Sequence, residues 1–85
     1  MNKTKVAYKT TIVNFIVDCY VELAQNITNI QKYIPETDLN QEMSTLKYLK
    51  NLIRTITAET DEEIEERIRE GKERFDKLEE DGENG

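Results

Sequence analysis

The residues of this chain with the clearest spacing for chemistry are carboxylates near its carboxyl end. Glu59 and Glu62, Glu62 and Glu65, and Glu73 and Asp76 are each three positions apart, a spacing with which helices can hold magnesium. Such a site needs carboxylate pairs on facing helices, whereas these pairs follow one another along one expected helix. In a segment this rich in glutamate the spacing arises by chance, so we predict no magnesium site.

Cys19 is the next candidate, because a thiol can act as a nucleophile. It is the only cysteine, so no disulfide can form within the chain, and the sequence has no histidine. The commonest general base and metal ligand is therefore missing. The neighbours of Cys19 are mostly apolar, which is typical of a buried, inert cysteine. We predict a protein that is not an enzyme and that has no cofactor and no metal.

Two basic groups could bind an anion. The first lies at the amino end and consists of Lys3, Lys5, Tyr8 and Lys9. The second consists of Lys47, Lys50 and Arg54, which share one side of a helix. Cations beside an aromatic ring can hold a nucleotide, so one alternative function is an oligomeric trap for small anionic ligands between subunits. For the second group we favour ion pairs with the acidic part of the chain.

Charge is divided unevenly along the 85 residues. Residues 1–58 have a net charge of +2, residues 59–85 have −8, and the whole chain has −6. An acidic chain does not favour nucleic-acid binding, although the basic amino end leaves it as a second alternative. In the acidic segment, basic residues stand four positions after glutamates, as in a solvated helix. The expected pairs are Glu63–Arg67, Glu65–Arg69, Glu70–Arg74 and Glu73–Lys77.

Apolar spacing predicts three helices. No glycine or proline occurs in residues 1–34, and a 3-4 spacing runs through Val13, Ile16, Tyr20, Leu23, Ile27, Ile30 and Ile34. Pro35 ends this first helix. Thr37 or Asp38 is expected to cap a second helix whose apolar residues run from Leu39 to Ile56. The short connection favours an antiparallel hairpin.

The third helix is expected from Asp61 to about Glu80, because Thr60 and Glu63 form a capping-box pattern. Gly71 stands within its apolar stripe, which indicates a close approach to another helix or a bend. Residues 1–80 then form a single helical domain, and residues 81–85 form a flexible acidic tail.

The first helix is more apolar than one small domain can cover. Its apolar arc is about 240° wide, against about 100° for an ordinary surface helix. Unbroken, it is about 46 Å long, so either it breaks near Asn26–Asn29 or the molecule is elongated with one flank bare. We therefore predict a homo-oligomer. The expected self-association residues are Ile12, Phe15, Ile16, Cys19, Tyr20, Leu23 and Ile27.

These patterns predict an all-α protein, in which a long antiparallel hairpin and a charged third helix form a small, homo-oligomeric bundle. The expected function is that of a small non-enzymatic interaction protein. It self-associates, and it binds and modulates another macromolecule, most simply as an inhibitor of another protein. Phage and mobile-element accessory factors have this character. Polar residues such as Asn14 and Asp18 interrupt the apolar stretch, so no membrane span or leader is expected and the location is cytoplasmic.

Overall fold

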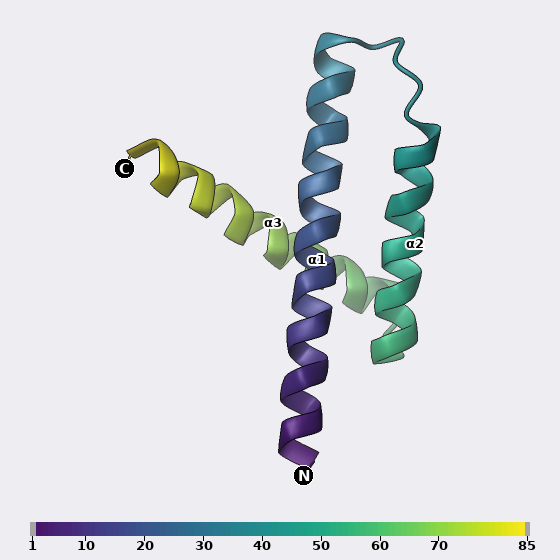
Figure 1. Ribbon diagram of the computed structural model, residues 1–85, viewed down its shortest axis with the longest axis vertical. Helices are drawn as coiled ribbons and strands as arrows, with labels where there is room; N and C mark the ends of the chain where they lie inside the picture. Colours follow the sequence, from purple (N-terminus) through teal and green to yellow (C-terminus); the bar gives the residue numbers. More distant parts are fainter. Residues whose placement is uncertain (1, 85) are drawn as a thin grey trace.

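The computed structural model consists of three α-helices, α1 (Asn2–Tyr33), α2 (Asn40–Thr57) and α3 (Asp61–Asn84) (Figure 1). It describes the backbone of residues 2–84 and the side chains of residues 10–78. The chain turns over residues 34–39, and α2 then runs back beside α1. The backbone over residues 2–84 contains no strand, which confirms the all-α prediction.

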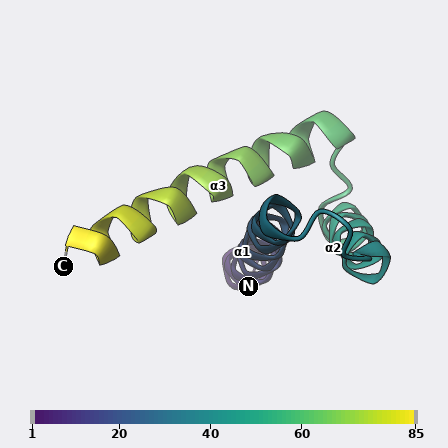
Figure 2. The same ribbon diagram turned by 90° about the horizontal axis from the view of Figure 1, so that it is seen from above.

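The helices form two layers. α1 and α2 lie side by side, and α3 crosses over both on one side of them (Figure 2). The molecule measures 49 × 35 × 18 Å, and its radius of gyration of 14.8 Å exceeds the value of about 12 Å for a compact chain of this length. α1 continues without a break through Asn26–Asn29. Of the two predicted alternatives, the elongated molecule is therefore the one observed.

The core lies where the three helices meet. Ile53 of α2 and Ile64 of α3 are both 0% exposed, and they pack against four residues of α1. Those four are Val13, Ile16, Val17 and Val21. The sequence pattern had placed Val17 and Val21 beside the seam rather than in it, but α3 packs on them. The seam residues Ile30 and Ile34, by contrast, are 38% and 53% exposed.

Gly71 lies where α3 packs closely against α1. A Cβ atom added at Gly71 would lie 2.6 Å from Cγ1 of Val17 and 3.3 Å from Cγ2 of Val21. Non-bonded carbon atoms do not approach to 2.6 Å, so a larger residue requires the Val17 side chain or α3 itself to shift. The predicted close helix approach at Gly71 is therefore confirmed.

The start of α3 is also confirmed. The Thr60 amide donates to Oε1 of Glu63 over 2.9 Å, and the Glu63 amide donates to Oγ1 of Thr60 over 3.3 Å, which is the reciprocal capping box. The expected cap of α2 is wrong, because Leu39 occupies the N-cap position. Asp38 instead accepts a hydrogen bond from the Asn40 amide over 3.0 Å, so it stabilises the turn that precedes α2.

The carboxyl ends of α2 and α3 differ from what the sequence patterns indicate. α2 ends at Thr57, and its C-cap residue Ala58 has a φ of 58°, in the left-handed region, and an amide that donates to the Arg54 carbonyl over 2.7 Å. α3 extends to Asn84, so residues 81–84 of the predicted tail belong to the helix backbone. Glutamate and lysine propagate helices well, and the carboxyl end of the chain contains no proline to stop this one.

Candidate interaction surface

The residues expected to mediate self-association separate into two groups. Ile16 and Ile27 are only 6% and 5% exposed, so they support the single chain and are not accessible to a second one. Phe15 is 68% exposed. The remaining four, Ile12, Cys19, Tyr20 and Leu23, are half-buried. The accessible part of the predicted surface is therefore centred on Phe15.

The direction of this surface follows from helix geometry. Each residue turns the helix by about 100°, so Cys19 points about 180° away from the Val17 and Val21 pair that packs on α3. The same side of α1 carries five more apolar residues, namely Ile12, Phe15, Leu23, Ile30 and Tyr33. It lies on the side of the α1–α2 layer away from α3 (Figure 2). Tyr33 is 77% exposed.

α2 continues this surface. Its residues on the same side are Gln41, Thr45, Tyr48, Leu52, Thr55 and Ile56. Tyr48 is 64% exposed. Thr45 and Thr55 donate their hydroxyl hydrogens to the Gln41 and Asn51 carbonyls of their own helix, over 3.0 Å and 2.9 Å, so neither hydrogen needs an outside acceptor. We call these residues of α1 and α2 together the uncharged face.

Charge is sparse on this face for a chain in which charged residues make up 35% of the sequence. On α1 the exposed Glu22 borders the face, because it stands about 20° around the helix from Phe15. Depletion of charge around exposed aromatic residues is typical of the central part of a protein–protein interface. The predicted self-association residues include neither the α2 half nor Ile30 and Tyr33 of α1. The signal was present, because Gln41, Thr45, Tyr48, Leu52 and Thr55 have a regular 4-3-4-3 spacing.

The basic group on α2 is largely occupied by α3. Lys50 pairs with Glu65 and Arg54 pairs with Asp61. The hydrogen bond to Glu65 raises the pKa of Lys50 above its ordinary value. This is the ion pairing favoured from the sequence. Lys47 is exposed on α2. The other group, Lys3, Lys5, Tyr8 and Lys9, lies outside the described side chains.

The cations of α3 do not form the pairs expected from spacing. Arg67 binds both carboxylate oxygens of Glu59, over 2.6 Å and 2.8 Å, and this pair lowers the pKa of Glu59. Arg69 pairs with Glu66. Arg74 reaches Asp18 of α1 over 3.3 Å. A long arginine side chain can thus pair with a carboxylate on a neighbouring segment in preference to the residue one turn away. Arg67 and Arg74 therefore connect α3 to other parts of the chain.

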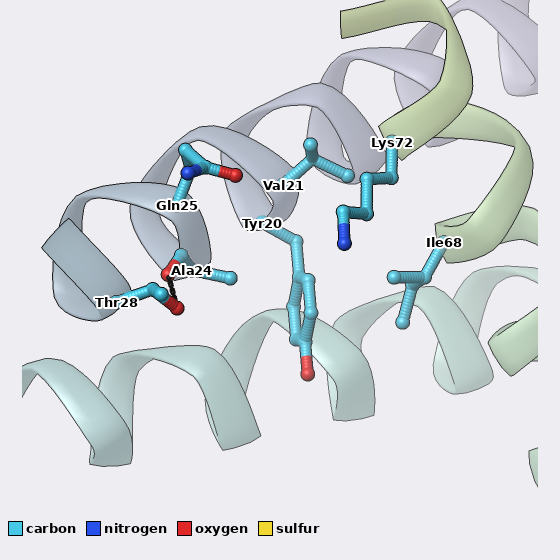
Figure 3. A pocket seen from close by; sticks show the side chains of 7 residues that line it. All are labelled: Tyr20, Val21, Ala24, Gln25, Thr28, Ile68 and Lys72. Carbon is cyan, nitrogen blue, oxygen red and sulfur yellow. Dashed lines mark hydrogen bonds between the residues drawn. The ribbon is translucent and has the colours of Figure 1, made fainter. Parts of the chain in front are cut away.

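A small cavity lies between α1 and α3 (Figure 3). Its volume is about 110 Å³, and its polar lining residues include Tyr20, Gln25, Thr28 and Lys72. The Thr28 hydroxyl donates to the Ala24 carbonyl over 3.0 Å. Pockets for drug-sized ligands measure about 300–1,000 Å³, so this cavity is too small to enclose a nucleotide.

Residues 10–78 hold no group of three or more cysteine, aspartate or glutamate side chains arranged to bind a metal ion. Within the same limits, no helix is both long and apolar enough to cross a membrane. No protein-family model matches the chain, and no curated protein or solved structure matches it significantly. The uncharged face is therefore the feature on which a function can be argued.

Proposed function

We propose that this chain is a small non-enzymatic interaction protein. Its antiparallel α1–α2 hairpin self-associates through the uncharged face, and the assembled form binds and modulates another macromolecule. The observation that carries this proposal is Phe15, which is 68% exposed among the apolar residues of the uncharged face. A phenylalanine there adds little hydrophobic stabilisation to the single chain. It stabilises a complex strongly once a partner removes its side chain from water.

The grouping of exposed aromatic residues supports the same reading. Large exposed apolar patches on soluble proteins mark interaction sites. Here Phe15, Tyr33 and Tyr48 are 68%, 77% and 64% exposed. Helix geometry directs all three away from the side of the α1–α2 layer that α3 covers. Aromatic residues are enriched among those that dominate binding energy at interfaces. Their common direction favours one extended interface over several scattered contacts.

The other candidate functions have weaker support. The anionic-ligand trap depends on free cations, but Lys50 and Arg54 are paired with Glu65 and Asp61. Nucleic-acid binding depends on the amino-end lysines of a chain whose net charge is −6. Neither alternative gives a role to the exposed aromatic residues of the uncharged face.

Size-exclusion chromatography coupled to light scattering tests the self-association. The elongated shape makes elution volume a poor guide to mass, whereas scattering gives the mass itself. We expect the mass of two or more 10.0 kDa chains, with dissociation on dilution. A single-chain mass at every concentration would contradict the proposal. Recovery of no specific macromolecule with tagged protein would count against the second part of it.

A further inference from the structure

α1 carries two heptad seams, and α2 covers only one of them. The first runs through Val13, Ile16, Tyr20, Leu23, Ile27, Ile30 and Ile34. The second, with a regular 4-3 spacing, runs through Ile12, Ile16, Cys19, Leu23, Asn26, Ile30 and Tyr33. The two share Ile16, Leu23 and Ile30, so they lie side by side on the helix. Two adjacent seams are the pattern of a helix with a helical neighbour on each of two sides.

The structure provides a neighbour for the first seam only. Val13 is 2% exposed and Ile27 is 5% exposed, whereas exposure along the second seam rises to 77% at Tyr33. α3 cannot supply the missing neighbour, because it packs on Val17 and Val21 on the opposite side of α1. Five of the seven residues of the second seam belong to the uncharged face, and no helix within the described residues covers that face.

We infer that a second copy of this chain covers the second seam, with α1 of one copy packed against α1 of the other about a two-fold axis. The inference rests on the proposed self-association and adds the number of copies and the residues that meet. A two-fold interface brings the same patch of both copies together, so the patch must be compatible with itself. An uncharged face meets this condition. The rest of a chain with net charge −6 repels its own copy.

The total exposed area of the chain leaves room for such a dimer. The chain exposes 6814 Å², whereas a folded monomer of 10.0 kDa exposes about 5,200 Å². The excess is about 1,600 Å², and a stable interface needs about 800 Å² from each partner. Part of the excess comes from the projecting ends of α1 and α3 (Figure 1). About half of it on the uncharged face is enough for a dimer of ordinary size.

Sedimentation equilibrium on matched variants tests this inference. Phe15→Glu and Tyr33→Glu each place a charge on the uncharged face, at residues that are 68% and 77% exposed. Leu78→Glu is the matched control, because Leu78 is 70% exposed but lies on α3. Circular dichroism verifies that each variant keeps its helices. We expect a dimer for the wild type and for Leu78→Glu, and a dissociation constant raised about tenfold or more for both face variants.

The outcomes separate this inference from the proposed function. A wild type that assembles as a trimer or larger ring overturns the two-fold dimer and leaves self-association standing. Tight dimers of either face variant, or dissociation of Leu78→Glu, overturn the choice of surface and likewise leave self-association standing. A wild type that stays a single chain at every concentration overturns both proposals.

Discussion

The two sides of α1 are both apolar, but the single chain covers only one of them. On the side facing α3, Val17 and Val21 are 1% and 4% exposed. On the opposite side, Phe15 and Tyr33 are 68% and 77% exposed. The difference comes from side-chain shape. α3 approaches α1 through Gly71, and only short side chains such as valine leave room for so close a crossing. Bulky aromatic residues occupy the side with no such crossing.

Apolar content alone does not identify the core of a small helical protein. A third helix can bury only one side of a long hairpin, and the other side of α1 stays exposed in the single chain. Substitutions on the two sides of α1 test whether the sides differ in this way.

The largest contrast is expected between a core residue and a residue of the uncharged face. Ile53→Ala creates a cavity at a site that is 0% exposed, and it should lower the free energy of unfolding by about 2–5 kcal/mol at every protein concentration. Phe15→Ala should lower it only by weakening assembly, so its effect should change with protein concentration. Urea unfolding at several concentrations measures both. An effect of Phe15→Ala that does not change with protein concentration would show that Phe15 stabilises the single chain and not an assembly.

The crossing at Gly71 can be tested by adding a single methyl group. Gly71→Ala gains helix propensity but places its Cβ 2.6 Å from Val17, so a net loss of about 1–2 kcal/mol in unfolding free energy is expected. In a Val17→Ala background the clash is relieved, and the same change should cost less. A double-mutant cycle by thermal or urea unfolding measures this coupling. Equal costs in the two backgrounds would show that α3 does not cross at Val17.

The turn between α2 and α3 sets where α3 begins its crossing. Ala58 has a φ of 58°, which is unfavourable for a residue with a Cβ atom. Ala58→Gly should therefore stabilise the chain by about 1 kcal/mol. Ala24→Gly in the middle of α1 is the matched control, and it should destabilise by about the same amount. Urea unfolding of the two variants should give shifts of opposite sign, and shifts of the same sign would contradict the left-handed turn.

The smallest effect is expected at Glu59, which Arg67 joins to α3. The pair lowers the pKa of Glu59. Its contribution to the free energy of unfolding is therefore fully present above the unfolded-state pKa of Glu59, and it is lost as the pH falls through the lower folded-state pKa. Glu59→Gln should lower unfolding free energy by less than about 1 kcal/mol at neutral pH, and the difference should shrink in acid. Glu62→Gln, at an exposed site on α3, is the control. A difference that grows in acid would contradict this pairing.

Much of the fold could be predicted from local patterns. Pro35 ends α1, Thr60 and Glu63 start α3, and Gly71 marks a close crossing, because each depends on residues near in sequence. The side of α1 that α3 covers could not be predicted. It depends on the direction in which the chain leaves α2, and Val17, Val21 and Phe15 are equally apolar in a sequence pattern.

Only part of the candidate site was predicted, because apolar residues of the core and of the surface look alike in the sequence. Phe15 was among the predicted residues and is exposed, whereas Ile16 and Ile27 proved to be core residues. Tyr48 on α2 was missed because an interface formed by two helices requires knowing how α2 is rotated against α1. The ion pairs likewise depend on how the helices pack. Arg74, for example, pairs with Asp18, which is far away in the sequence.

A photoreactive phenylalanine analogue at position 15 tests directly whether the uncharged face meets the same face of a second copy. The wild-type side chain there is 68% exposed, so the analogue should not disturb the fold. After irradiation of the full chain, we predict a covalent dimer in which mass spectrometry maps the cross-link to α1 or α2 of the other copy. Cross-links confined to α3, or none between chains while the wild type assembles, would contradict it.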